Sequence, residues 1–160
     1  MSWNFGSAIL GGLLATLVLT TVTAAGRSLG FSRMGMSFIL GTIFTPDRKK
    51  AEIIGFLFHL VNGWAFAFLY AVIFERWSRT GVLLGSGLGL AHGVIVLVAL
   101  LPLVPQIHPR MATEEHGPDP TRALEPPGFL GLNYGRRTPI LTLVAHILYG
   151  AIIGGFYQLA

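Results

Sequence analysis

The sequence predicts an all-α membrane protein: a four-helix transmembrane bundle with a short interfacial or re-entrant helix between spans 1 and 2. Of its 160 residues, 52% are hydrophobic and only 11% are charged, whereas about a quarter of a typical soluble domain is charged. The mean hydropathy is +0.66. Four apolar stretches also reach roughly 20 residues, the length that crosses about 30 Å of bilayer hydrocarbon.

Each stretch is bounded by residues that do not belong in a bilayer. No charge precedes Arg27, the second stretch lies between Glu52 and Glu75, and the third ends near Pro102, since proline does not continue a helix easily. The fourth begins at Pro139, a good first-turn position for proline. The predicted spans of this single membrane domain, residues 1–160, are 6–25, 53–74, 80–104 and 138–158.

A cleaved signal peptide is the alternative for the first stretch. Residues 1–5 contain no lysine or arginine, and the apolar run that follows is longer than the core of a typical signal peptide. A retained span is therefore expected.

Two long loops, 26–52 and 105–137, separate the spans. In the first loop, residues 31–44 are apolar but too short to span, which predicts the interfacial or re-entrant helix. Asp47 or Thr45 is expected to cap the next helix. In the second loop, residues 127–135 are apolar enough to fold back onto the membrane surface.

Basic residues predict the orientation. The two long loops hold nine lysines and arginines, and the turn 75–79 holds only Arg76 and Arg79. The positive-inside rule places the long loops in the cytoplasm and both termini outside. Tyr70, Trp77, Trp3 and Tyr157 are expected to form an aromatic belt at the outer interface.

The absence of cysteine excludes disulfides and thiolate metal sites. The net charge of +4 is explained by basic loops beside a membrane, so the expected partners are the lipid bilayer and other membrane subunits or a second copy, with no nucleic acid.

An internal repeat is suggested by two histidine segments. His59 and His146 are each followed by glycine four residues on and by tyrosine eleven residues on. Two parallel copies of a span–loop–span unit would explain the match, as in some transporters; chance similarity in a glycine-rich apolar sequence is the alternative.

Three histidines fall within predicted spans, on three different helices: His59, His92 and His146. Ionisable side chains inside a bilayer are costly and by default suggest function. From the loop ends of their spans they lie roughly 12, 17 and 12 Å deep, at about 1.5 Å per residue. We expect them to share one layer of the bundle interior.

Small residues lie on the same helix faces as these histidines, among them Gly63, Gly89 and Gly150. They allow close helix packing or leave room for a flat macrocycle whose metal takes an imidazole ligand. Asn62 and Tyr149 could bind a ligand or fix a histidine tautomer. A purely structural layer, a bound haem, other tetrapyrrole or metal, and a proton or quinone pathway all stay open, although no span contains a carboxylate to help a proton relay.

A second cluster lies in the proline-rich loop, where His108 and Met111 are candidate metal ligands. Thioether and imidazole groups suit Cu(I), and Met34 and Met36 would lie nearby if the loops meet. The simpler interpretation is that the histidines and acids of this loop are solvated: His108, His116, Glu114 and Glu115.

Five runs of the sequence are informative together: residues 40–48, 55–63, 108–111, 127–135 and 145–150. In these runs the chain resembles a group of small four-span bacterial membrane proteins with no assigned activity. The resemblance implies a location in the bacterial cytoplasmic membrane and assigns no functional residue.

The expected function is that of a small integral membrane subunit in a larger complex. Its histidine layer would bind a redox or pigment cofactor, or line a quinone pocket, and no catalytic residue is assigned. A cofactor-free accessory subunit is the main alternative, and a small transporter is the third.

Overall fold

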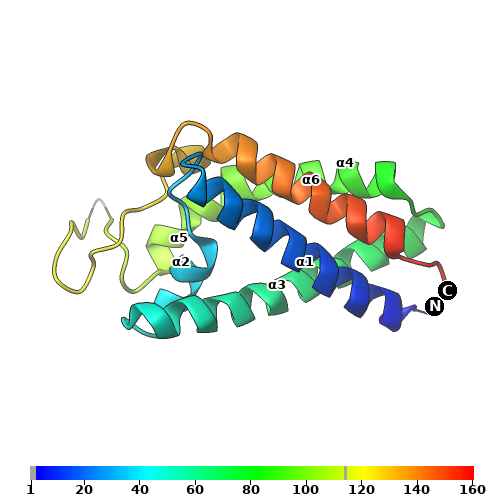
Figure 1. Cartoon of the computed structure of the whole chain (residues 1–160), viewed down its shortest axis with the longest axis horizontal. Coiled ribbons are helices and arrows are strands. Elements are labelled where there is room, and N and C mark those ends of the chain that lie inside the picture. Colours follow the sequence, from blue (N-terminus) through cyan, green and yellow to red (C-terminus); the bar gives the residue numbers. More distant parts are fainter. Residues whose placement is uncertain (1–2, 114) are drawn as a thin grey trace.

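Within residues 3–113 and 115–160, which the computed structural model describes, four apolar helices are long enough to cross a membrane. They are α1 (Phe5–Ser28), α3 (Arg48–Trp77), the continuous run Val82–Ile107 and α6 (Thr138–Phe156). Both ends of the chain lie at one end of the bundle and the long loops at the other (Figure 1). The predicted all-α, four-span fold is confirmed.

Helix α3 begins five residues before the predicted start of its span because its first turn is capped. The side chain of Asp47 accepts the backbone N–H of Lys50 at 2.8 Å, which satisfies a donor that the helix itself leaves unpaired. The basic residues that precede the apolar stretch are therefore helical as well.

The third span is one continuous run of three helical segments. Helix α4 (Val82–Ile95) leads into a π-helical turn, η1 (Val96–Leu100), and then into α5 (Leu101–Ile107). The predicted end near residue 104 is three residues short. The wider π turn directly precedes Pro102, where the missing N–H and the ring of proline interrupt regular α-helical bonding.

A short helix, α2 (Met36–Thr42), lies between spans 1 and 2, as predicted. It packs against the start of α3, where a Cβ on Gly55 would lie 2.6 Å from the backbone nitrogen of Gly41. A 3-10 segment, η2 (Phe129–Tyr134), occupies the second loop. The two loops meet: the backbone N–H of Arg33 donates to the carbonyl oxygen of Tyr134 at 2.7 Å.

The bundle contains two antiparallel helix pairs in which a glycine faces the neighbouring helix. In the α1–α3 pair, a Cβ on Gly63 would lie 2.9 Å from Cβ of Thr16. In the α4–α6 pair, a Cβ on Gly150 would lie 2.0 Å from the carbonyl oxygen of Gly85. Gly63 and Gly150 each follow a histidine by four residues, but Gly63 meets a side chain and Gly150 meets backbone. The internal repeat stays a prediction.

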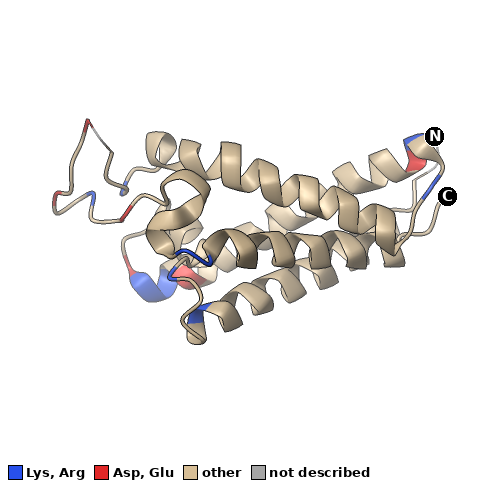
Figure 2. Cartoon of the chain, turned by 90° about the horizontal axis from the view of Figure 1, so that it is seen from above, with Lys and Arg blue, Asp and Glu red and all other residues tan. Residues whose placement is uncertain are grey.

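The outward surface of the four spans is apolar. Leu10, Leu57, Leu83 and Ile140, one on each span, are all more than half exposed. Lysine, arginine, aspartate and glutamate gather at the two ends of the bundle (Figure 2). A water-soluble bundle would cover such faces with polar side chains, so the chain is a multi-pass membrane protein.

The expected aromatic belt is only partly present. Trp77 is exposed, but Tyr70 and Tyr157 are each 3% exposed and belong to the main apolar core. The hydroxyl of Tyr157 donates to the Glu75 carboxylate at 2.8 Å. These tyrosines point inward because their helix faces carry the contacts between the spans.

Candidate functional site

The rings of His92 and His146 contact each other inside the bundle. Their centroids are 4.7 Å apart and the rings are nearly perpendicular. The contact follows from the close packing of α4 on α6: a Cβ on Gly89, one turn before His92, would lie 2.2 Å from the carbonyl oxygen of His146. Because glycine has no side chain, the backbones of α4 and α6 approach closely here, and this approach brings the two imidazoles into contact.

Aromatic side chains surround His92. Phe66 stacks on its ring with centroids 3.9 Å apart, and Tyr149 lies edge-on at 5.9 Å. The Tyr70 hydroxyl lies 3.4 Å from Nδ1 of His92. Because His92 is only 9% exposed, it is the enclosed member of the histidine layer.

The hydrogen bond of His146 fixes its tautomer when it is neutral. Nδ1 lies 2.8 Å from the carbonyl oxygen of Thr142, and a carbonyl only accepts, so Nδ1 carries the proton. Nε2 then has a lone pair available. Nearby, the Thr142 hydroxyl is buried and has no hydrogen-bond partner among the described residues, which is uncommon in a protein interior.

His59 lies on α3, in the other helix pair. Its Nδ1 lies 3.3 Å from the hydroxyl of Thr20 on α1, and it is half-buried. Of the three span histidines, His92 and His146 are in ring contact, whereas the hydrogen bond of His59 is with α1. A layer formed by all three stays a prediction.

Tyr149 and Asn62, the two other predicted ligand contacts, differ in whether their side chains are hydrogen-bonded. The Tyr149 hydroxyl donates to the carbonyl oxygen of Gly63 at 2.5 Å, so it ties α6 to α3. Asn62, on the same turn of α3 as Gly63, is half-buried and has no side-chain hydrogen bond within the described part of the chain. Of these two, Asn62 is the one with free hydrogen-bonding groups.

The glycine faces of the α4–α6 pair beside His92 and His146 leave no space for a flat macrocycle. The glycine faces that could have admitted one are filled by the neighbouring backbone, with a Cβ on Gly85 placed 2.1 Å from the carbonyl oxygen of Gly150. Across residues 3–113 and 115–160, no group of three or more histidine, aspartate or glutamate side chains is arranged to hold a metal ion.

His108 and Met111 lie apart from this layer, where the second loop meets α2. Nε2 of His108 donates to the carbonyl oxygen of Ile39 at 2.9 Å, and Nδ1 accepts the N–H of Arg110 at 3.1 Å. Met111 is completely buried in an apolar cluster that also contains Met34. A metal would have to displace one of these hydrogen bonds.

The surroundings of His108 favour its neutral form. Burial lowers its pKa below the ordinary value; the hydrogen bond to Ile39 partly offsets this effect, and the Arg110 charge reinforces it. Arg110 also donates to the carbonyls of Thr42 and Ile43, which end α2. The motif therefore fastens the second loop to α2. His116 is exposed, and Glu114 lies outside the described residues.

Sequence reasoning missed three contacts of the site: Phe66, Tyr70 and Thr20. Phe66 and Tyr70 lie four residues apart on one face of α3, but many helix faces in this chain carry aromatic residues. Only the tertiary structure, which brings these two side chains against the His92 ring on α4, selects this face.

No family model, curated protein or solved structure matches the chain. The fold therefore supports a small four-span membrane protein, and no family is identified.

Proposed function

We propose that this protein is a small membrane subunit that binds the headgroup of a quinone at the partly exposed edge of the histidine layer. We define this edge by His59 and Asn62, three residues apart on α3, and by His146 on α6, which are all half-buried within their spans. This exposure carries the proposal: polar side chains at such depth are costly unless a ligand or another helix covers them.

The hydrogen-bonding groups at this edge suit a quinone. The His146 lone pair accepts a hydrogen bond from a quinol hydroxyl, and the amide of Asn62 donates to a quinone carbonyl. Quinones partition into the bilayer, so they reach this depth without crossing water. The filled glycine faces disfavour a tetrapyrrole, the other cofactor expected from the sequence.

Direct binding is the test. The whole protein in lipid nanodiscs is titrated with a short-chain benzoquinone, and quenching of tryptophan fluorescence is followed; Trp64 lies two residues after Asn62. Asn62→Leu is expected to weaken binding about tenfold, because its amide no longer donates to the quinone carbonyl and such a hydrogen bond is worth about 1.4 kcal/mol. Val61→Leu, a change on the exposed face of α3, is the matched control.

The second candidate is a cofactor-free accessory subunit whose partner helix covers the same edge. The half-buried, unbonded Asn62 favours it equally. In that case quinone quenching is the same in all variants, and Asn62→Leu instead lowers the yield of a co-purifying membrane protein. Equal quenching in the unaltered protein, Asn62→Leu and Val61→Leu would rule out the quinone proposal.

A further inference from the structure

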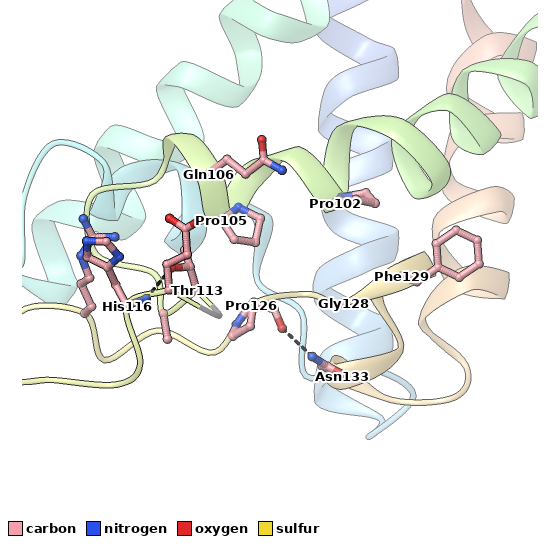
Figure 3. A pocket seen from close by; sticks show the side chains of 12 residues that line it. Pro102, Pro105, Gln106, Thr113, His116, Pro126, Gly128, Phe129 and Asn133 are labelled. Carbon is pink, nitrogen blue, oxygen red and sulfur yellow. Dashed lines mark hydrogen bonds between the residues drawn. The ribbon is translucent and has the colours of Figure 1, made fainter.

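A separate pocket of about 1060 Å³ opens at the loop end of the third span. Figure 3 shows Pro102, Pro105 and Gln106 along one wall, on the final turns of this span, with Thr113, His116 and Asn133 on the loop that faces them. It shares no residue with the histidine layer.

The position of this pocket is the membrane interface. Its first wall belongs to the apolar run Val82–Ile107, and the opposite wall is polar loop. Two large apolar side chains at this end face outward: Ile107 is 76% exposed and Phe129, in the pocket wall, is 62% exposed. A ligand here would have an apolar part toward the bilayer and a polar part toward the loop.

The charged groups in the wall have opposite signs. Arg122 and Glu115 both line the pocket, and neither belongs to an ion pair among the described residues, where the pairs are Arg33 with Glu125 and Arg48 with Glu52. Asp119 accepts the backbone N–H groups of Thr121 and Arg122 through Oδ1, at 2.6 and 2.9 Å. That turn holds the Arg122 backbone, and the Arg122 charge also acts on the nearby Asp119 carboxylate, while its side chain lines the pocket.

We infer that this pocket binds the headgroup of an aminophospholipid, of the phosphoethanolamine class. A guanidinium forms strong bidentate hydrogen bonds to phosphate, and a carboxylate accepts hydrogen bonds from a primary ammonium group. Arg122 supplies the first group and Glu115 the second. The acyl chains then leave past Pro102 and Phe129 into the bilayer.

An anionic headgroup suits the pocket less well, because it has no cation to pair with Glu115. A choline headgroup carries no N–H donor for this carboxylate. The inference is therefore specific for a primary ammonium group beside a phosphate, and it does not depend on the proposed quinone site.

Native mass spectrometry of the detergent-purified whole protein tests this inference. The protein is mixed with equal amounts of phosphatidylethanolamine, phosphatidylcholine and phosphatidylglycerol, and the retained lipid is measured. The ethanolamine lipid is expected to dominate. Arg122→Gln should reduce its retention about tenfold, and Glu115→Gln should move the preference toward phosphatidylglycerol. Arg136→Gln, an exposed arginine at the same end but outside the pocket wall, should change neither.

A second substitution at Arg122 and a soluble competitor complete the test. Arg122→Lys keeps the positive charge and should retain more lipid than Arg122→Gln, which separates binding from misfolding. Soluble phosphoethanolamine should compete poorly, because it lacks the acyl chains. Equal retention of the three lipids, equal effects of Arg122→Gln and Arg136→Gln, or full competition by soluble phosphoethanolamine would each overturn the inference.

Discussion

Replacing Gly150 by alanine is expected to force α4 and α6 apart. The added Cβ would lie 2.0 Å from the carbonyl oxygen of Gly85 and 2.8 Å from the backbone nitrogen of Gly89. Ordinary contacts of carbon need about 3.5 Å, so the helices must separate by about 1.5 Å at this point. Both obstructing atoms belong to backbone, and no side-chain rotation removes the overlap.

The expected cost is about 3 kcal/mol, the upper part of the range measured for overpacked interiors. For a chain of this size that corresponds to a fall in melting temperature of about 6–12 °C. The measurement is thermal unfolding of the purified protein in detergent, followed by the loss of the monodisperse peak in size-exclusion chromatography.

Gly87→Ala is the matched control on α4. Nothing lies within 4 Å of a Cβ at Gly87, so its melting temperature should stay near that of the unaltered protein, with a change within about 0.5 kcal/mol. If the Gly150 and Gly87 variants melt together, the close α4–α6 contact is not a source of stability and the packing argument fails.

Three further outcomes are expected from other contacts. Arg110→Gln should destabilise the protein by about 1–2 kcal/mol, because the carbonyls that end α2 lose charged donors, and limited proteolysis should cut the second loop faster; unchanged cutting would contradict this role. Tyr149→Phe should lower the free energy of unfolding by about 1 kcal/mol in the same thermal assay, because the hydrogen bond to α3 is lost. A loss of stability no larger than that of an exposed aromatic control would refute this role of the hydroxyl. The lowered pKa of His108 means that the unfolded chain takes up a proton first, so stability should fall as the pH drops below about 6.5; the fall should be shallower in His108→Gln than in the unaltered protein.

The sequence alone was sufficient for the four spans, and it predicted that three histidines lie at similar depths within them. Bilayer thickness fixes the number of apolar residues that a helix needs, and the constant rise of a helix converts residue counts into depths. For this reason His59, His92 and His146 could be placed at one level without any knowledge of packing. The Asp47 cap was predictable because capping is local.

Tertiary structure decided the use of each helix face. From the sequence, the glycines beside the histidines could have admitted either a macrocycle or a neighbouring helix. In the structure a neighbouring helix occupies this space, with Gly89 of α4 against the His146 carbonyl of α6. Tyr70 turned inward and His108 gave both ring nitrogens to protein partners. The physical reason is that periodicity fixes depth along a single helix, whereas rotation about the helix axis depends on which neighbour fills the small-residue groove.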